Sequence, residues 1–277
     1  ERLSVISTRE CGGDAVFVES VRRALESIRE GRFRKIVLAR ALDLQANQAF
    51  HPLEILNTLR ERYADCYAFS IANGRGQSFI GASPECLVSV RKGRLRVDVL
   101  AGTAPRGATA SEDAALGSAL LQSEKDLREH AIVYDSIRRR LEELGVVVDN
   151  ACRPRLKKLQ NVQHLHVEIE AEMPAGAHLL DMVSTLHPTP AVGGTPREEA
   201  ISRIRDFESF DRGLYAAPIG WINASGDGAF LVAIRSALVS GSSARLYAGV
   251  GIVEGSVPER EHAETNLKFR ALMENLL

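Results

Sequence analysis

Residues 67–100 read YAFSIANGRGQSFIGASPECLVSVRKGRLRVDVL. Asn73-Gly74 and Lys92-Gly93 are turn signals inside this stretch, and the β-rich runs around them predict consecutive strands. Strands joined by short turns pair in an antiparallel way, whereas parallel strands need long crossover connections. The stretch therefore predicts antiparallel sheet. The expected strands are 67–72, 78–81, 86–90 and 95–100.

The sequence on both sides of this stretch predicts further strands and amphipathic helices. We expect strands at 35–44, 162–172, 215–222, 229–239 and 244–253. We expect helices at 15–30, 51–63, 111–121, 125–144, 179–186, 197–208 and 258–277. Because the strands come in adjacent groups, the expected fold class is α+β, with antiparallel sheets and helices outside them. No linker-like segment interrupts the chain, so we predict a single domain over residues 1–277.

The composition is that of an ordinary globular protein. Of 277 residues, 45% are hydrophobic, and 35 basic against 36 acidic residues leave a net charge of -1. A nucleic-acid partner normally requires a basic face, and a membrane span requires ~20 apolar residues, so neither is expected. The four cysteines form no CxxC pair, which favours reduced thiols in a cytoplasmic protein.

Two acidic pairs share the same spacing. Asp126 and Glu129 occur in KDLREH, and Glu261 and Glu264 occur in EREHAET. Residues three apart share a helix face, so two such faces brought together would present up to four carboxylates. Mg²⁺ prefers oxygen ligands and commonly takes one or two carboxylates together with water and substrate. Spacing alone favours the plainer interpretation, which is two charged helix faces in solvent.

Three other features are candidates for a site, and each also has a plainer interpretation. Lys35 begins an apolar strand, where burial disfavours the charged form and suits a base, but a strand-end lysine more often reaches water. Glu85 precedes a strand, and a carboxyl group near an apolar surface can stay protonated and act as an acid. The alternative for Glu85 is an exposed turn residue. The glycines of AGVG (248–251) allow close approach of a ligand, or merely tight packing.

Ten strings along the chain together resemble the chorismate-utilising enzymes, which include isochorismate, salicylate, anthranilate and aminodeoxychorismate synthases. They are FRKIVLAR (33–40), FIGASPECL (79–87), LAGTAPRG (100–107), SEKDLREH (123–130), VQHL (162–165), HPTPAVGG (187–194), RGLYAAPIGW (212–221), AIRSAL (233–238), LYAGVGIVEGS (246–256) and EHAETNLKF (261–269). The strings follow the order found in that family and cover nearly the whole chain. The resemblance implies two antiparallel sheets packed together with helices outside, and it favours a functional interpretation of the acidic pairs.

The resemblance also implies roles for individual residues. Glu129 and Glu264 match the direct Mg²⁺ ligands, and Asp126 and Glu261 match carboxylates close to them. The residues that match groups around the two carboxylates of chorismate are Gly102, Thr103, Gly249 and Lys268 for the ring carboxylate, and Tyr215 and Arg235 for the enolpyruvyl carboxylate. An arginine suits this position because its planar fork binds a carboxylate through two hydrogen bonds.

Lys35 resembles the water-using branch of the family, since ammonia-using members usually carry a non-basic residue there. The resemblance implies an isochorismate synthase in which Lys35 activates a water that attacks C2 of chorismate, and Glu85 protonates the departing C4 hydroxyl. His164 matches a histidine linked to the pyruvate-eliminating step of salicylate synthases, but isochorismate synthases carry one too. Salicylate synthase therefore stays an alternative, as does a non-catalytic chorismate-binding subunit.

Family members usually have a longer N-terminal region before the helix expected at 15–30. We therefore expect that an N-terminal segment is missing from this sequence. The balanced charge and the resemblance favour a monomer. The resemblance leaves open whether isochorismate would serve siderophore, menaquinone or salicylate synthesis.

Overall fold

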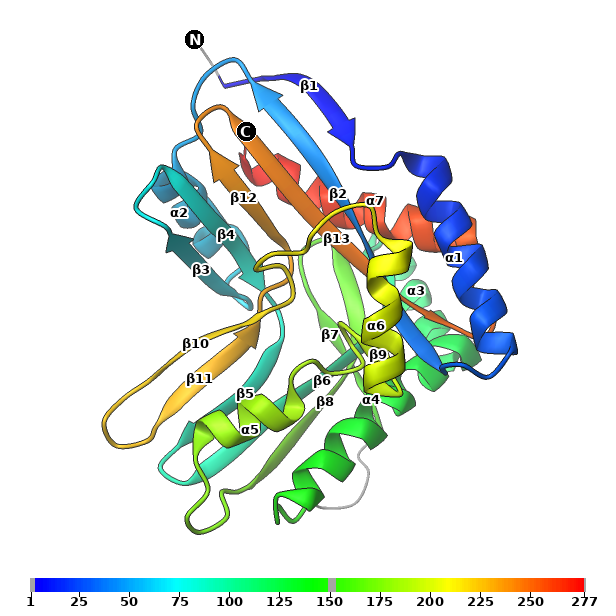
Figure 1. Cartoon of the computed structure of the whole chain (residues 1–277), viewed down its shortest axis with the longest axis vertical. Helices are drawn as coiled ribbons and strands as arrows, with labels where there is room; N and C mark the ends of the chain where they lie inside the picture. The colour runs from blue at the N-terminus through cyan, green and yellow to red at the C-terminus, as the bar shows by residue number, and fades with distance from the viewer. Residues whose placement is uncertain (1–2, 149–152, 277) are drawn as a thin grey trace.

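The structure, a computed structural model, describes residues 3–148 and 153–276 and contains two antiparallel β-sheets surrounded by helices (Figure 1). From edge to edge, the first sheet (the upper sheet) consists of β1 (Val5–Glu10), β2 (Lys35–Ala46), β13 (Ser243–Val253), β12 (Ser236–Ser240), β4 (Gln77–Ser83) and β3 (Tyr67–Ala72), and the short β9 (Gly194–Thr195) also pairs with β2. The second sheet (the lower sheet) consists of β10 (Pro218–Ile222), β11 (Gly228–Val232), β5 (Cys86–Arg91), β6 (Arg94–Pro105), β8 (Val162–Glu172) and β7 (Arg155–Lys158). The predicted α+β fold with two packed antiparallel sheets is confirmed.

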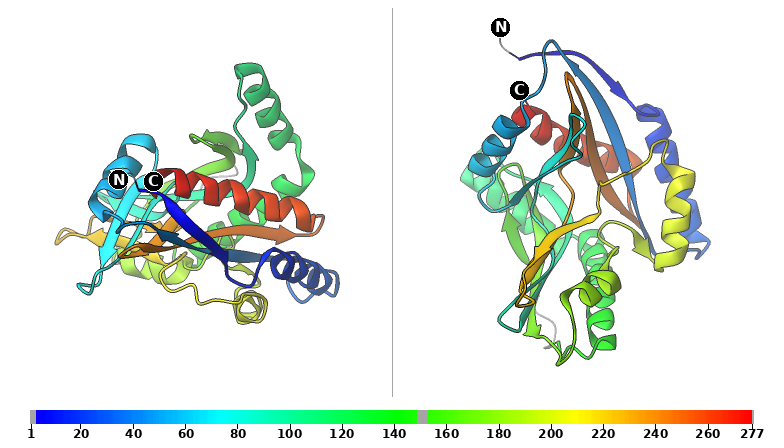
Figure 2. Two further views of the ribbon diagram at one scale, coloured as in Figure 1. Left: turned by 90° about the horizontal axis from the view of Figure 1, so that it is seen from above. Right: turned by 60° about the vertical axis from the view of Figure 1, so that its left-hand side comes forward.

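The helices cover the outer surfaces of the sheets. They are α1 (Asp14–Arg29), α2 (Pro52–Arg62), α3 (Ala110–Gln122), α4 (Glu124–Glu143), α5 (Leu179–Leu186), α6 (Arg197–Phe207) and α7 (Pro258–Leu276). α1, α2 and α7 pack against strands of the upper sheet, and α3, α4 and α5 pack against strands of the lower sheet. Figure 2 shows α7 running along the upper sheet. Each helix expected from the sequence is present, although the last residue of the final one lies outside the described residues.

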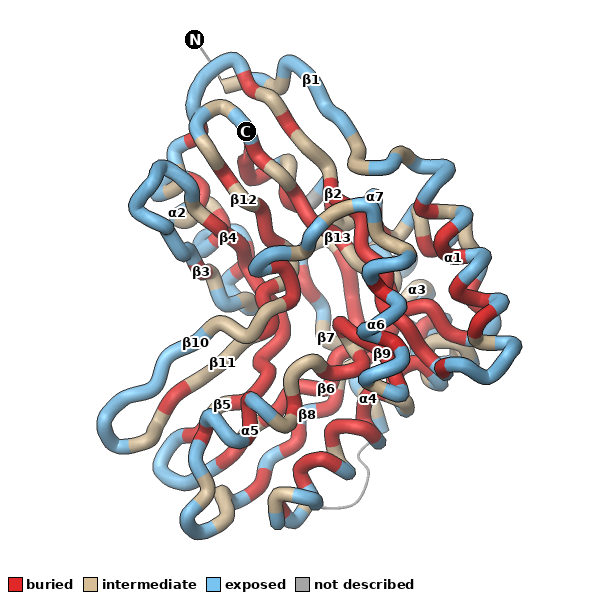
Figure 3. The backbone as a smooth tube through the Cα atoms, viewed as in Figure 1, coloured by how far each residue is buried: buried red, intermediate tan, exposed pale blue. Residues whose placement is uncertain are grey.

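One face of β2 packs in the hydrophobic core, and the other face lines a cavity. Side chains alternate along a strand, so even-numbered and odd-numbered residues point to opposite faces. Ile36 and Leu38 pack in the hydrophobic core under α1, whereas Lys35 and Val37 line a cavity on the opposite face. Residues 35–41 are all buried, which explains why this strand is apolar along its length rather than alternating. Figure 3 shows that buried segments gather where the two sheets meet.

The chain passes directly from a strand of one sheet to a strand of the other at two places, between β4 and β5 and between β11 and β12. The sequence predicts one strand over 229–239, and this prediction is wrong. The structure has β11 in the lower sheet and β12 in the upper sheet, with residues 233–235 as the crossing. Arg235 has a φ of 52°, a left-handed conformation that turns the chain. Because both strands are apolar, the change of sheet leaves no mark on the hydrophobic pattern.

Other differences concern short or polar segments. Three observed strands, β1, β7 and β9, are not predicted by the sequence. They have few apolar residues and are defined by their pairing with β2 or β8. The strand predicted at 215–222 begins only at Pro218. Before it, the backbone makes turns, with hydrogen bonds from Tyr215 N to Arg212 O (2.8 Å) and from Ala217 N to Leu214 O (3.1 Å).

Arg40 lies at the centre of a charged network that joins β2 to α1 and α7. Its guanidinium group donates to the Glu10 carboxylate (2.6 Å from Nε to Oε1), to Asp14 Oδ1 (2.8 Å) and to Thr265 Oγ1 (2.7 Å). His262 Nε2 lies 2.9 Å from the same Asp14 oxygen. Glu10, Asp14 and His262 have the residue types of a metal site, but the Arg40 guanidinium already occupies the space between the two carboxylates. The network therefore anchors α7 to the sheet.

Among residues 3–148 and 153–276, no helix combines the length and the apolar character that a bilayer crossing requires. Cys11, Cys66 and Cys86 are free thiols. Cys152 lies outside the described residues.

Replacing Arg40 with methionine is expected to destabilise the fold by about 2–3 kcal/mol, because the partly buried carboxylate of Glu10 loses its charged hydrogen-bond partner. Urea unfolding at pH 7 measures the change. Arg245→Met is the matched control, because Arg245 pairs with Asp43 at a site where its side chain is 37% exposed. This control should change stability by no more than about 1 kcal/mol. Equal effects of the two substitutions would contradict the anchoring role of Arg40.

Candidate active site

A cavity lies between the two sheets, and its walls come from β2, β13, β6, β8, α4 and α7. Eleven of the thirteen residues predicted for the site line it, namely Lys35, Glu85, Gly102, Thr103, Glu129, His164, Tyr215, Arg235, Gly249, Glu264 and Lys268. The other two, Asp126 and Glu261, line an adjoining groove together with Glu264. The structure therefore brings the predicted residues together, while their individual roles stay predictions.

A buried ion pair joins the two sides of the cavity. Lys35 Nζ at the start of β2 donates to Glu129 Oε1 on α4 over 2.9 Å, and the two side chains are only 1% and 8% exposed. Gly251 on the neighbouring strand β13 makes room for this pair. A Cβ atom at this position would overlap the Glu129 carboxylate and would lie 2.9 Å from Lys35 Cε. The ion pair therefore requires a glycine at position 251, the second glycine of AGVG.

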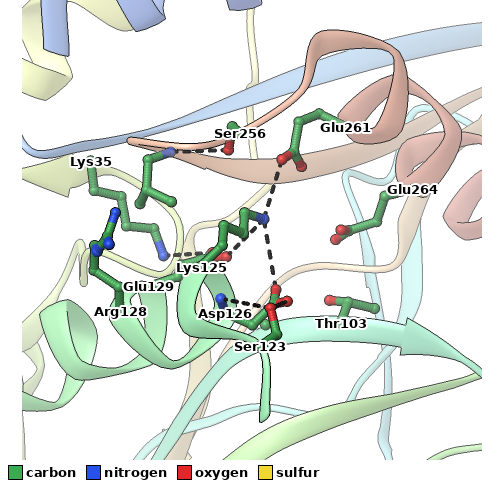
Figure 4. Close-up of polar contacts among 12 residues, drawn as sticks. Lys35, Thr103, Ser123, Lys125, Asp126, Arg128, Glu129, Ser256, Glu261 and Glu264 are labelled. Atoms are coloured by element: carbon green, nitrogen blue, oxygen red, sulfur yellow. Dashed lines mark hydrogen bonds and ion pairs between the residues drawn. The ribbon is translucent and has the colours of Figure 1, made fainter. Parts of the chain in front are cut away.

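Three carboxylates of the two acidic pairs surround the ammonium group of Lys125 (Figure 4). Its Nζ lies 3.2 Å from Glu261 Oε1, 3.5 Å from Glu129 Oε2 and 3.7 Å from Asp126 Oδ1. The first turn of α4 helps to place Asp126, because the Ser123 hydroxyl at the N-cap accepts a hydrogen bond from the Asp126 N–H (3.3 Å). The helix faces predicted from the i, i+3 spacing therefore do converge, and they converge on a cation.

The cluster concentrates negative charge in a buried place. Burial raises the pKa of Glu261 to about 7, and burial also raises the pKa of Asp126. At Glu129 burial acts in the same direction, but Lys35 and Lys125 outweigh it, so the pKa of Glu129 is lowered. Burial alone would lower the pKa of Lys125, but the surrounding carboxylates, with Glu264 among them, raise it overall. Such a set of oxygen donors stabilises a positive charge and suits a hard divalent cation.

Lys268 links α7 to β13 at the edge of the cavity. Its Nζ donates to Gly249 O (2.7 Å) and to Glu264 Oε1 (2.8 Å). Gly249 also allows Tyr215 to approach, since a Cβ atom there would lie 2.6 Å from the Tyr215 hydroxyl. Tyr215 stacks on Tyr247 with ring centroids 5.2 Å apart. Burial raises the pKa of Tyr215, so its hydroxyl stays protonated and can donate a hydrogen bond.

His164 holds Arg235 in the cavity. The Arg235 guanidinium donates to His164 Nε2 over 2.7 Å, and His164 Nδ1 lies 3.2 Å from Gly102 O and 3.1 Å from Thr103 Oγ1. Because arginine has no acceptor, Nε2 must be unprotonated, and the ring proton is on Nδ1. Burial and the charge of Arg235 keep the pKa of His164 well below its ordinary value, so the ring is neutral. In this structure His164 therefore orients an arginine.

Glu85 lies at the other crossing between the sheets, between β4 and β5. It is 3% exposed and lines the cavity. Burial, and next the charge of Asp98, raise the pKa of Glu85 to about 8, whereas Lys35 and Lys157 lower it. The group is therefore protonated at neutral pH and can donate a proton. The alternative of an exposed turn residue is wrong.

Lys125 is a part of the site that was not predicted from the sequence. The sequence does indicate that Lys125 lies near Glu129. Lys125 is the first residue of KDLREH and is four residues before Glu129, on the same helix face. The i, i+3 spacing of the two pairs identified only acidic residues. The position of Lys125 among their carboxylates becomes evident only where α4 and α7 meet in the fold.

Known proteins match most of the chain, and a family model matches all of it. The family described as chorismate binding enzyme matches residues 1–277. "Salicylate biosynthesis isochorismate synthase" of Pseudomonas aeruginosa is 45% identical over 253 residues, which are 91% of this chain and 53% of that protein. "Isochorismate synthase MenF" of Bacillus subtilis is 40% identical over 260 residues, 94% of this chain and 55% of that protein. The chain thus spans about half the length of these two relatives.

Solved structures match in the same way. A structure described as a putative 2,3-dihydroxybenzoate-specific isochorismate synthase, DhbC, from Bacillus anthracis has a TM-score of 0.94 and 34% identity, covering 100% of this chain and 75% of that one. Anthranilate synthase component I from Streptococcus pneumoniae has a TM-score of 0.83 and 27% identity, covering 97% of this chain and 60% of that one. The similarity therefore includes the arrangement of the two sheets.

The buried carboxyl of Glu85 predicts a specific pH dependence of stability. In the unfolded chain this group ionises near 4.5, and in the folded protein near 8, so folding loses stability as pH rises between these values. Glu85→Gln keeps the shape but cannot ionise. The stability of the wild type relative to this variant should therefore fall between pH 5 and pH 8 in urea unfolding. The exposed Glu170→Gln should show no such difference, and parallel pH curves for wild type and Glu85→Gln would contradict the prediction.

Proposed function

The chain belongs to the chorismate binding enzyme family, and from this premise we propose that it converts chorismate to isochorismate with the help of Mg²⁺. The observation that carries the proposal is the pair of buried groups Lys35 and Glu85, which line one cavity and are suited to act as base and acid. The relatives named isochorismate synthase support the same reaction. The chain spans only about half of their length, so the activity of the whole protein is part of the proposal.

The substrate carries two carboxylates, and the cavity offers a cation for each. Arg235 is proposed to bind the enolpyruvyl carboxylate, with the protonated Tyr215 hydroxyl as a further donor. His164 keeps the Arg235 guanidinium in one orientation, so the arginine is in place before the substrate arrives. Lys268 and the backbone of Gly102, Thr103 and Gly249 are proposed to bind the ring carboxylate.

The reaction is a substitution with an allylic shift. The oxygen of a water forms a bond to C2 while Lys35 takes a proton from that water. The ring double bond moves, and the C4–oxygen bond breaks as Glu85 donates a proton, so that the hydroxyl leaves as water. Because Glu85 must be protonated, the rate should fall as pH rises through about 8.

Lys35 has to be neutral when the water arrives. In the structure its ammonium group is bound to Glu129. Lys35 and a bound metal ion would share Glu129, so the metal would compete with Lys35 for this carboxylate and would release the Lys35 side chain toward the water.

Glu129 and Glu264 are proposed as direct ligands of Mg²⁺, with Asp126 and Glu261 close to them. The donor set fits, because three of these carboxylates already surround one cation, Lys125 Nζ, and carboxylate oxygens are the ligands that Mg²⁺ prefers. When bound, Mg²⁺ would supply positive charge to the ring carboxylate and to the rearranging ring. The Lys125 side chain is 24% exposed and has a path to solvent when it gives up its place.

Incubation of the protein with chorismate and Mg²⁺, followed by product identification, tests the function. Isochorismate is the expected product, and EDTA or Glu264→Ala should abolish its formation. Salicylate with pyruvate as the main products would instead identify a salicylate synthase, and binding without turnover would identify a non-catalytic subunit. Full activity in metal-free buffer would refute the role of Mg²⁺.

Lys35→Ala tests the base separately from binding. Removal of a general base typically lowers a rate by ~10²–10⁴-fold. We expect such a loss in isochorismate formation, while the affinity for chorismate measured by calorimetry changes little, since Arg235 and Lys268 are intact. Near-native turnover in this variant would show that another group activates the water.

A further inference from the structure

Behind Glu85 lies a group of charged residues that the proposed reaction does not use. Asp98 on β6, Lys157 on β7 and His166 on β8 are in contact, and none of them lines the cavity. The Asp98 side chain is completely buried. A buried carboxylate is costly to maintain without a role in structure or function, so the cluster requires an explanation.

The cluster binds the backbone on both sides of Glu85. Asp98 Oδ2 accepts a hydrogen bond from the N–H of Cys86, the residue after Glu85, over 3.0 Å. Lys157 Nζ donates to the carbonyl oxygen of Pro84, the residue before Glu85, over 2.6 Å. Lys157 and Asp98 are themselves paired at 3.4 Å. The two peptide groups that flank Glu85 are therefore joined by one ion pair, of which the Asp98 side is completely buried.

This arrangement is needed because Glu85 lies where the chain passes from one sheet to the other. Its backbone has only two other polar contacts among the described residues, one from Val232 N–H to its carbonyl (3.1 Å) and a local exchange with the Ser83 hydroxyl (3.2 Å from Glu85 N). No hydrogen bond from a described residue holds the Glu85 carboxyl group itself. Its position is thus set through the backbone. The strands that support that backbone are β6 and β7, which carry Asp98 and Lys157.

The same two residues also affect the pKa of Glu85, in opposite directions. The negative charge of Asp98 raises the pKa of Glu85, and the positive charge of Lys157 lowers it. Asp98 stays ionised, because burial is outweighed by His166 and Lys157 and its pKa is lowered to about 2. The remaining charged or titratable groups around Glu85 are Lys35 on β2 and Tyr215 before β10.

We propose that Asp98 and Lys157 are positioning residues that hold Glu85 in place for its role as the acid, and that their opposite charges act on its carboxyl group. The proposal rests on the proposed function of the cavity. A plainer alternative is that the buried pair only stabilises the lower sheet. The two explanations differ in turnover, because the loss of a pair that only stabilises the sheet leaves kcat unchanged in a variant that still folds.

The test uses Asp98→Asn and Lys157→Met, assayed for turnover of chorismate at saturating substrate and Mg²⁺ across pH 6–10. Asp98→Asn keeps an oxygen that can accept from Cys86 N–H but loses the negative charge, so the basic limb of the kcat profile should move to lower pH. Lys157→Met removes a positive charge and releases Pro84 O, so its basic limb should move to higher pH. Lys157→Met should also lower kcat on the order of tenfold with KM nearly unchanged, because a displaced acid costs rate rather than affinity.

Lys158→Met is the matched control. Lys158 follows Lys157 on the same strand, but its Nζ pairs with Asp113 (2.8 Å), away from Glu85. This variant should keep the wild-type pH profile and kcat. The double variant Asp98→Asn/Lys157→Met removes both charges, so its basic limb should lie between those of the single variants.

Basic limbs that stay at the wild-type pH in both single variants would overturn the proposal and leave a structural role only. If Asp98→Asn fails to fold, Lys157→Met decides, since its side chain is 18% exposed and its loss leaves His166 paired with Asp98. An unmoved limb in Lys157→Met then overturns the proposal. Failure of the proposed function is seen separately, in wild-type protein that forms no isochorismate.

Discussion

The ion pair between Lys35 and Glu129 is the interaction on which the rest of the site depends. It joins β2 of the upper sheet to α4, which packs on the lower sheet, and it lies at the bottom of the cavity between them. Two charges with almost no exposure to water are stable only if each has a partner at short distance. The position of β2 relative to α4 is therefore constrained by electrostatics as well as by packing. Gly251 is part of the same constraint, because a side chain there would separate the pair.

Two other site residues are placed by the points where the chain changes sheet. Glu85 lies between β4 and β5, and Arg235 lies between β11 and β12. At such a point the backbone leaves the regular pairing of one sheet before it enters the next, so side chains can point into the space between the sheets. The cost is a less regular backbone, seen in the positive φ of Arg235. His164 stabilises the arginine through its side chain, whereas Glu85 is held through the neighbouring peptide groups.

Much of the fold could be predicted from the sequence, because local patterns report local structure. The helices were found from their apolar spacing, and the strands at 67–72 and 162–172 match the observed bounds. The prediction failed at 229–239, where an apolar run hides a change of sheet, and at β1, β7 and β9, where pairing rather than composition makes the strand. The candidate site was predicted mainly from the family resemblance. Spacing alone favoured solvated faces for the two acidic pairs, and only their convergence on Lys125 shows otherwise.

The sequence by itself determined which residues were available and on which element each would lie. It placed the acidic pairs on single helix faces, Lys35 at the start of an apolar strand and Glu85 before another, since helical and strand periodicity are properties of neighbouring residues. Only the tertiary structure decided the charge states, because those depend on burial and on partners far away in the chain. Lys35 meets Glu129 across 94 positions, and Asp98 meets Lys157 across 59. Water is excluded from these contacts only when the two sheets close over them, and the electrostatic interactions that define the site become strong for that reason.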